Sequence, residues 1–162
     1  MSVTHEDSNP TAALQGLLDR TEIKELLTRY YSGLDAGDPE GLGRFFEDDA
    51  ELDVNGLKAR GPAEIAKLYR TVAADKPRLI GTFRMLLNNL TIQIDGDTAT
   101  AQMLWTQTLN ETIKGPPRLI EEGREFDTLA KRGGRWRIVK RVVVADSGMP
   151  NIFDATYRPR AD

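Results

Sequence analysis

The spacing of apolar residues changes near Pro77 and keeps its new period to Ala145, and this change restricts the fold more than any other feature. Before it, apolar side chains recur every three or four residues, as on one face of a helix. After it, they alternate with polar ones, as in a strand with one buried face. The spacing predicts helices over 21–35, 39–46 and 62–75, followed by strands over 79–94, 99–109, 119–129 and 136–145.

Turn residues agree with this division. Asp38 followed by Pro39 is typical of a helix start, and Asp95-Gly96-Asp97 and Gly133-Gly134 are typical of tight turns between antiparallel strands. A further short strand is expected within 48–56. Three helices before an antiparallel, strongly curved sheet predict an α+β fold, a cone-shaped and mostly antiparallel sheet wrapped by three N-terminal helices.

One domain is expected over residues 15–146, because 162 residues with 40% hydrophobic content are enough for a single core. Residues 1–14 open on a polar stretch and predict a flexible N-terminal tail. Residues 147–162 predict a C-terminal tail, whose Ile152, Phe153 and Tyr157 would pack across a pocket mouth or on a neighbouring subunit.

The scarcity of histidine and cysteine excludes several kinds of chemistry. His5 is the only histidine, and there is no cysteine, so imidazole catalysis, thiol nucleophiles and His- or Cys-bound metals lack their central residues. We expect no metal and no cofactor. The net charge of -3, with basic residues dispersed among acidic ones, argues against nucleic acid or a membrane as partners. The short apolar runs and the absence of a charged-then-apolar leader predict a cytoplasmic protein.

The stretch 81–90, GTFRMLLNNL, places a charged residue in an apolar strand. Even-numbered positions over 90–94 are apolar and face the core, and the same register carried backward places Arg84, Leu86 and Asn88 inside as well. A bulge at the pair Asn88-Asn89 would reverse that orientation. The direction of Arg84 therefore depends on one extra residue in the strand.

An inward arginine needs an anion, because an unpaired buried charge is strongly destabilising. Asp35 is the best candidate, since it lies one turn beyond Tyr31 on the stripe of the first helix that faces the sheet, although it could simply cap that helix. On the following strand, Trp105 shares a face with apolar residues and is expected to point inward. The inner face of the next strand is not assignable, so one of its acids could enter the pocket. Its charged residues are Glu121, Glu122, Arg124, Glu125 and Asp127.

The order and spacing of several short motifs resemble the SnoaL-like group of the nuclear transport factor two superfamily, over about residues 15–146. These motifs are YYSGLDAGD at 30–38, FFEDDA at 45–50, Gly61-Pro62 before a helix, Asn88, DGDTA at 95–99 and GGRWRI at 133–138. The resemblance implies a curved sheet around an apolar pocket. Members include scytalone dehydratase, ketosteroid isomerase, polyketide cyclases, a dehydrochlorinase and epoxide hydrolases, alongside members that only bind.

By this resemblance Asp35 matches the pocket aspartate of dehydratase-like members, which pair it with a histidine four residues before an asparagine. Here Arg84 stands at the histidine position, and arginine cannot act as a base because its pKa lies above about 12. We expect Asp35 to transfer a proton, Arg84 to stabilise negative charge and Tyr30 to orient the substrate. The expected substrate-binding residues are Asn88, Trp105, Tyr31, Leu86, Met103, Tyr69 and Phe126.

These expectations lead to a cofactor-independent lyase, which removes water or cleaves a carbon-carbon bond in a small apolar, aromatic or polyketide-like substrate. One alternative is a double-bond isomerase or cyclase. Another is an epoxide hydrolase, which by the resemblance uses an Asp-Arg-Asp arrangement and would need a second inward carboxylate, such as Glu125 or Asp127. A third is a binding module in which Arg84 and Asp35 form a structural pair. The resemblance also implies a homo-oligomer, a dimer or trimer, formed through the convex face of the sheet.

Overall fold

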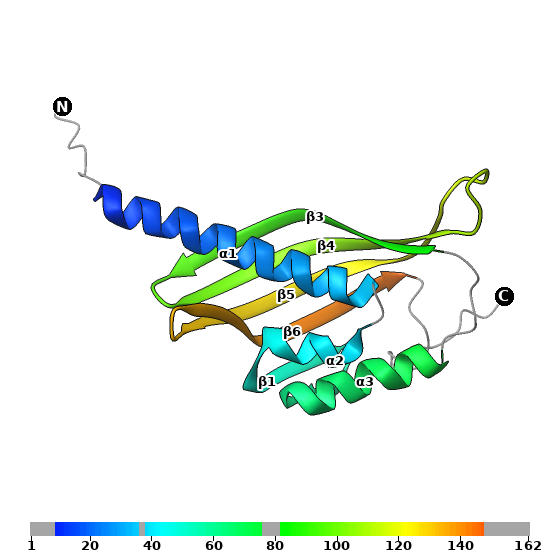
Figure 1. Cartoon of the computed structure of the whole chain (residues 1–162), viewed down its shortest axis with the longest axis horizontal. Coiled ribbons are helices and arrows are strands. Elements are labelled where there is room, and N and C mark those ends of the chain that lie inside the picture. Colours follow the sequence, from blue (N-terminus) through cyan, green and yellow to red (C-terminus); the bar gives the residue numbers. More distant parts are fainter. Residues whose placement is uncertain (1–8, 36–37, 76–81, 148–162) are drawn as a thin grey trace.

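The computed structural model of the chain describes residues 9–35, 38–75 and 82–147, and the side chains of residues 35, 39 and 71–75 lie outside this description. The elements within it are three α-helices, one 3-10 turn and a six-stranded sheet that is curved and does not close into a barrel (Figure 1). This arrangement confirms the α+β fold that the spacing of apolar residues predicts.

The first helix, α1 (Pro10–Asp35), is longer than expected. Asn9 caps it, since its side-chain Oδ1 accepts a hydrogen bond from the Thr11 N–H at 3.0 Å and its carbonyl accepts one from the Ala13 N–H at 3.0 Å. Pro10 then occupies the first helical position, where the missing N–H is harmless. Residues 10–14, expected in a flexible tail, therefore belong to the helix.

The second expected helix is split into α2 (Pro39–Leu42) and the 3-10 turn η1 (Gly43–Phe45). Asp38 caps α2 as predicted, because its Oδ1 accepts a hydrogen bond from the Gly41 N–H at 3.0 Å. The third helix is α3 (Gly61–Asp75). None of the helices in the described ranges is both long and apolar enough to cross a membrane.

The sheet has the strand order β2-β1-β6-β5-β4-β3. Its strands are β1 (Phe46–Val54), β2 (Leu57–Arg60), β3 (Thr82–Asp95), β4 (Thr98–Asn110), β5 (Arg118–Arg132) and β6 (Arg135–Ser147). β1 pairs with β6 in parallel, and the other neighbours are antiparallel. Asn55 and Gly56, both with positive φ, form the tight turn between β1 and β2.

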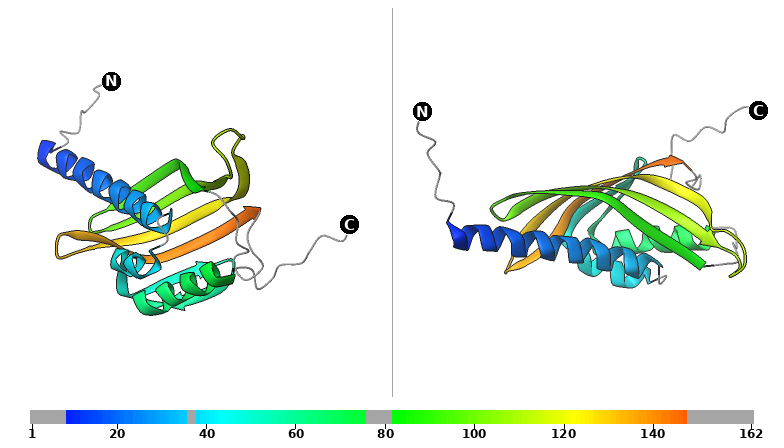
Figure 2. Two further views of the ribbon diagram at one scale, coloured as in Figure 1. Left: turned by 45° about the vertical axis from the view of Figure 1, so that its right-hand side comes forward. Right: turned by 90° about the horizontal axis from the view of Figure 1, so that it is seen from above.

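All three helices lie on the concave face of the sheet, α1 across β3, β4 and β5 and α3 beside β1 (Figure 2). Apolar side chains from both layers meet between them, among them Leu27 of α1, Ile65 of α3 and Leu52 of β1, all fully buried. The far end of this core is anchored by Asp19 of α1, whose Oδ1 accepts hydrogen bonds from Lys131 Nζ at 2.6 Å and Trp136 Nε1 at 3.0 Å. α1 is thereby tied to both β5 and β6.

Two of the register irregularities in the described sheet decide which side chains of β3 and β6 face the helices. In β3, residues 89 and 90 lie opposite the single residue Met103 of β4, and Asn89 has a φ of 52°. In β6, Val139 is an extra residue, because Ile138 and Lys140 pair with the adjacent residues 129 and 128 of β5. Each extra residue reverses the inward and outward positions on either side of it.

Candidate functional site

The extra residue in β6 turns Arg141 toward the helices. Trp136 and Ile138 point inward before the bulge, and Arg141 and Val143 point inward after it. The Arg141 side chain is fully buried, with an exposed fraction of 0%. A guanidinium in this position requires charged partners, because a buried charge without them is strongly destabilising.

Two carboxyl groups of β5 supply these partners. Asp127 binds Arg141 in a bidentate manner, with Nε to Oδ1 at 2.8 Å and Nη2 to Oδ2 at 3.1 Å. Glu125, the next inward position on β5, places Oε1 3.1 Å from Arg141 Nη2. Both carboxyl groups are buried, with exposed fractions of 3% and 1%. One cation therefore lies between two acids in the interior.

Aromatic side chains of α1 close this cluster from the helix side. The Tyr31 hydroxyl donates a hydrogen bond to Glu125 Oε2. The Tyr30 ring lies under Arg141, with the guanidinium carbon 3.9 Å from the ring centroid, and its hydroxyl shares a hydrogen bond with that of Tyr69 on α3. Consecutive residues of α1 thus contact the cation and one of its acids.

Burial sets the protonation of the cluster. Burial raises the pKa of Glu125 well above its usual range; Asp127 also raises it, while Arg141 opposes the rise. Burial likewise raises the pKa of the Tyr31 hydroxyl, with Glu125 adding to the effect, so this hydroxyl keeps its proton. The site therefore contains a carboxyl group that can hold a proton where exposed glutamates are ionised, beside a permanent cation.

Two buried polar atoms of this cluster have no hydrogen-bond partner among the described residues. Within the described parts of the chain, Arg141 Nη1 and Glu125 Oε1 are buried atoms without a hydrogen-bond partner, although Oε1 forms the ion pair given above. Such atoms are uncommon in folded interiors and call for an explanation. A donor and an acceptor that remain available next to a proton-carrying carboxyl group can meet a polar ligand.

Five of the side chains predicted to form the site face the concave interior. Trp105 and Met103 are buried inward positions of β4, which agrees with the predicted direction of Trp105. Tyr30 and Tyr31 are buried against the Arg141 cluster, and Tyr69 is half-buried beside Tyr30. These residues lie close to the ionisable groups described above.

Four others face outward, and for Arg84, Leu86 and Asn88 the predicted inward direction is wrong. Arg84, Leu86 and Asn88 precede the bulge in β3, so they lie on the convex face, and Arg84 Nη1 donates to the carbonyl of its neighbour Phe83 at 2.8 Å. The alternative with a bulge at Asn88-Asn89 is the one confirmed. Phe126 occupies an outward position of β5, with an exposed fraction of 37%.

Asp35 is the last residue of α1, and its side chain lies outside the described residues. The predicted contact between Asp35 and Arg84 therefore lies outside the described residues. Because Arg84 faces outward, it is not the cation that was expected inside the cone beside Asp35. Among the described residues, the fully buried cation is Arg141.

Arg141 was missed because the alternation of polar and apolar residues in its strand cannot be followed beyond Ile138. Residues 142–144 are three consecutive valines, so the apolar pattern is the same on both faces, and the extra residue at 139 is invisible in it. The charged residues of β5 were recognised as candidates, but the sequence did not indicate which of them face the helices. The structure turns Glu121, Glu125 and Asp127 inward and Glu122 and Arg124 outward.

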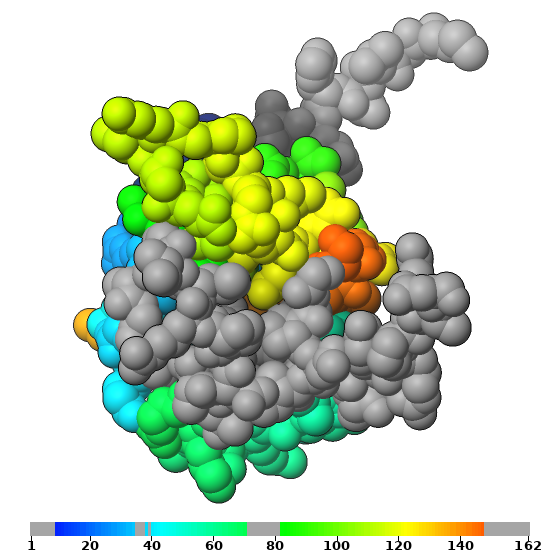
Figure 3. Space-filling view, turned by 90° about the vertical axis from the view of Figure 1, so that its right-hand side faces the viewer, coloured from blue at the N-terminus to red at the C-terminus, as the bar shows by residue number. Residues whose placement is uncertain are grey.

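Figure 3 views the molecule from the end at which β4 turns into β5 and β6 ends. Inward-facing side chains near this end are only half-buried, among them Met85 and Leu87 of β3, Tyr69 of α3 and Ala145 of β6. Deeper positions, such as Glu125 and Asp127, are fully covered. The inward-facing side chains are thus less covered at this end than around the Arg141 cluster.

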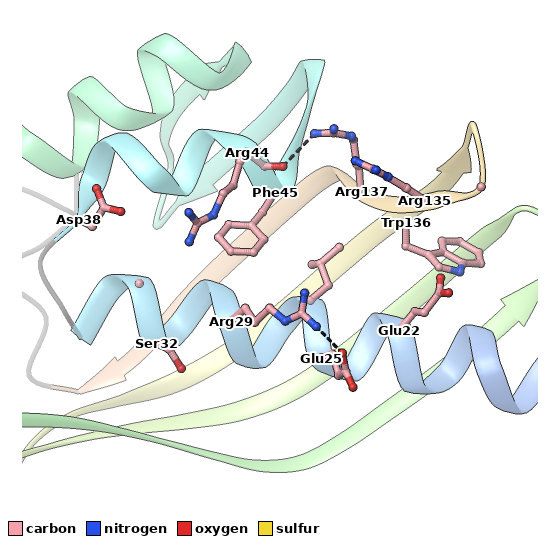
Figure 4. Close-up of a pocket in the computed structure, with 13 residues that line it drawn as sticks. Glu22, Glu25, Arg29, Ser32, Asp38, Arg44, Phe45, Arg135, Trp136 and Arg137 are labelled. Carbon is pink, nitrogen blue, oxygen red and sulfur yellow. Dashed lines mark hydrogen bonds and ion pairs between the residues drawn. The ribbon is translucent and has the colours of Figure 1, made fainter.

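A separate groove of about 870 Å³ lies between α1, η1 and the turn that joins β5 to β6 (Figure 4). It is lined by charges of both signs, including Glu22, Glu25, Arg29, Arg44 and Arg135, and it shares no residue with the Arg141 cluster. The buried cluster, which holds acid and cation away from water, is the stronger candidate for catalysis. Among the residues that the structure describes, no three acidic or histidine side chains gather as a metal site.

A curved, unclosed sheet with helices on its concave face is the fold of NTF2-like proteins. An NTF2-like protein with a cystatin-like fold from Novosphingobium aromaticivorans is 29% identical and superposes with a TM-score of 0.71, covering 91% of this chain and 96% of that chain. Residues 15–142 match the SnoaL-like domain, and the chain belongs to this family. The resemblance derived from the motifs is thus confirmed.

Two further relatives agree with this assignment. An uncharacterised protein of Mycobacterium tuberculosis is 28% identical over 130 residues, which cover 76% of this chain and 83% of that protein. A Novosphingobium aromaticivorans protein proposed to be a scytalone dehydratase is 20% identical, with a TM-score of 0.68 and coverage of 90% and 92%. At that identity the second likeness shows the fold alone.

Proposed function

We propose that this protein is a cofactor-free enzyme of the lyase class, which removes water from a small, largely apolar and aromatic hydroxy carbonyl compound. The observation that carries the proposal is the Glu125 carboxyl group, buried to 1% exposure, with a raised pKa and in contact with a buried guanidinium. Membership of the SnoaL-like family supports a small-molecule function for this interior.

Glu125 has the properties required of a group that both accepts and donates a proton. A raised pKa brings a carboxyl group closer to neutral pH, where proton transfer in either direction is efficient. In its ionised form Glu125 would take the proton from the carbon next to the substrate carbonyl. The protonated carboxyl would then return that proton to the leaving hydroxyl, so that water departs and the enzyme regains its starting state.

Arg141 would stabilise the negative charge that develops on the carbonyl oxygen between these two steps. Its Nη1 is the available donor, while Asp127 holds Nε and Nη2 in a fixed orientation. Tyr31 would hold the Glu125 carboxyl group through its hydrogen bond. The neighbouring Met103 and Trp105 provide an apolar wall for a flat substrate.

Epoxide hydrolysis is the second candidate, because two carboxyl groups flank one arginine as that reaction requires by the resemblance. Glu125 would protonate the opening epoxide oxygen while a carboxylate takes a proton from the attacking water. Both Asp127 oxygens already accept hydrogen bonds from Arg141, which makes Asp127 less available as that base. We therefore rank dehydration first.

The wild-type protein is expected to dehydrate the aldol adduct of benzaldehyde and acetone to the corresponding enone, followed by its ultraviolet absorption. Styrene oxide, assayed in parallel for diol formation, tests the second candidate. Conversion of the epoxide alone would replace the lyase assignment by hydrolysis. Binding of both compounds with no conversion above the buffer rate would leave a binding module as the better description.

The convex face supports a second proposal, a homo-oligomer. Leu86, Leu104 and Phe126 form a diagonal stripe over β3, β4 and β5, with exposed fractions of 50%, 37% and 37%. Outward-facing Val142 of β6 continues this stripe opposite Phe126. A contiguous apolar stripe at the centre of a sheet face is typical of an interface, and a second copy would cover it.

Replacing Leu104 with lysine is expected to convert the oligomer to a monomer, because it places a charge in the middle of the apolar stripe. Light scattering coupled to size-exclusion chromatography would measure the mass. Leu17→Lys, at an exposed position of α1, is the matched control and should leave the mass unchanged. A wild-type protein that is already monomeric at high concentration would contradict this proposal.

A further inference from the structure

The concave face carries a second polar pair beyond the Arg141 cluster. Trp105 and Gln107 are successive inward positions of β4, with exposed fractions of 2% and 8%. The donor Trp105 Nε1 and the acceptor Gln107 Oε1 both lack a hydrogen-bond partner within the described ranges. Buried polar atoms are nearly always paired in folded proteins, so two unpaired atoms on adjoining positions indicate a missing partner.

These unpaired atoms are concentrated on the face that a ligand would occupy. Five buried side-chain atoms without a hydrogen-bond partner occur in the described chain, and four of them belong to Trp105, Gln107, Glu125 and Arg141, all on the concave face. The fifth belongs to Glu47 of β1. Buried polar atoms that lacked a hydrogen-bond partner by chance would not be expected to lie mostly on one face, between the helices and the sheet.

The Trp105 indole is held in place by the strand beside it. Trp105 pairs with Gly123 of β5, and a Cβ at that glycine would lie 2.5 Å from Trp105 Cζ2 and 2.3 Å from the Val144 carbonyl oxygen. Only glycine leaves room for the ring there. The direction of the indole N–H is therefore set by the packing of β4 against β5.

Strand register gives the distance between the two polar sites. Met103 pairs with Glu125, Trp105 with Gly123, and Gln107 with Glu121. Each step of two residues along a strand covers about 7 Å, so Trp105 is one step and Gln107 two steps from the level of Glu125. Apolar side chains of β3, Leu87 and Met85, face inward opposite Trp105 and Gln107.

We propose that Trp105 and Gln107 bind a hydroxyl group of the ligand, at the end of a flat molecule opposite to its reacting carbon. The Trp105 N–H would donate to the hydroxyl oxygen, and the hydroxyl proton would be donated to Gln107 Oε1. A hydroxyl group satisfies both atoms, whereas a carbonyl or an ether leaves Gln107 unpaired and an ammonium leaves Trp105 unpaired. A phenol whose side chain reaches Glu125 has the required length.

This inference rests on the proposed function only for the end of the ligand that meets Glu125. Recognition of the hydroxyl group needs no chemical step, so it can be measured by binding alone. The probes are benzalacetone and its para-hydroxy derivative, which differ by the one hydroxyl group. Their affinities would be measured by calorimetry for the wild type, Gln107→Leu and Trp105→Phe.

The wild type is expected to bind the para-hydroxy compound at least about tenfold more tightly than benzalacetone, because its hydroxyl group pairs two buried atoms. Gln107→Leu should lose most of this preference while binding benzalacetone nearly as the wild type does. Trp105→Phe should also lose most of the preference, and its affinity for both probes should fall, because Trp105 forms part of the apolar wall. Gln102→Leu, on the exposed side of the same strand, is the matched control and should keep the preference. Thermal unfolding would confirm that each variant is folded.

Equal affinity of the wild type for both probes, a preference that survives in Gln107→Leu, or no binding of either probe would each overturn the inference. Repeating the titrations with Glu125→Gln separates it from the proposed reaction. A hydroxyl preference in a wild-type protein that converts no substrate would retain the hydroxyl site and reject the lyase assignment. Conversion without a hydroxyl preference would do the opposite.

Discussion

Glu125→Gln is expected to lower the rate of dehydration by about a hundredfold to ten-thousandfold, the usual contribution of a general acid or base. The amide keeps the size of the side chain and an acceptor for Tyr31, but it can neither take the proton from carbon nor return it to the leaving hydroxyl. The measurement is kcat/KM on the aldol adduct. In the wild type it should rise with pH through the raised pKa of Glu125, since the first step needs the ionised form.

Glu122→Gln is the matched control, because Glu122 lies on the same strand as Glu125 but is exposed, whereas Glu125 faces inward. It should leave kcat/KM within about twofold of the wild type, as expected for a surface position. Retention of full activity by Glu125→Gln would assign the proton transfer to another group. The outward direction of Arg84 would not be changed by either result.

Glu125→Gln is also expected to change the pH dependence of the free energy of unfolding. Above the ordinary glutamate pKa of 4.5, the unfolded chain loses a proton that folded Glu125 retains. The folded state binds more protons in this window, so the free energy of unfolding falls as pH rises, by at most about 1.4 kcal/mol per pH unit, until Glu125 ionises in the folded protein. Glu125→Gln lacks this slope, and its stability relative to the wild type should therefore rise with pH in denaturant titrations.

Arg141→Met is expected to lower the free energy of unfolding by about 3–5 kcal/mol, which is the usual effect of removing one partner from a buried ion pair. The methionine fills part of the space but leaves Asp127 without either of its charged hydrogen bonds and Glu125 without its cation. Urea denaturation at neutral pH would measure the loss. The matched control is Arg124→Met, whose exposed ion pair with Asp146 at 2.8 Å should contribute less than about 1 kcal/mol.

A double variant distinguishes the loss of an ion pair from the loss of packing. Asp127→Leu combined with Arg141→Met removes both charges, and it should be more stable than Arg141→Met alone, because no uncompensated carboxylate remains at position 127. If the double variant is less stable than the single one, packing around the guanidinium, including its contact with the Tyr30 ring, outweighs the electrostatic loss.

The period change near Pro77 was enough to predict helices followed by an antiparallel sheet, because burial of one face imposes a repeat of 3.6 residues on helices and of 2 on strands. It also indicated the inward direction of Trp105, whose strand has an unbroken alternation. The length of α1 was underestimated, since its start depends on the Asn9 cap and Pro10 rather than on a repeating apolar face.

The candidate site was only half predictable. Tyr30 and Tyr31 lie on the buried stripe of α1 and were identified from it, whereas the cation was assigned to Arg84 and is Arg141. The outward direction of Arg84 and the inward direction of Arg141 were missed for the same reason. A strand's alternation determines two faces but not which residue is doubled in a bulge, and each bulge exchanges the faces beyond it.

The amino-acid sequence by itself therefore determined the fold class, the family and the kind of side chains that fill the interior, because these follow from local periodicity and from motifs along the chain. Only the tertiary structure decided which charges meet. The bulges at 89–90 and 139 form where neighbouring strands must pair and curve together, and that pairing joins residues far apart in the sequence. It turned Arg84 to the convex face and brought Arg141, Glu125 and Asp127 together beneath α1.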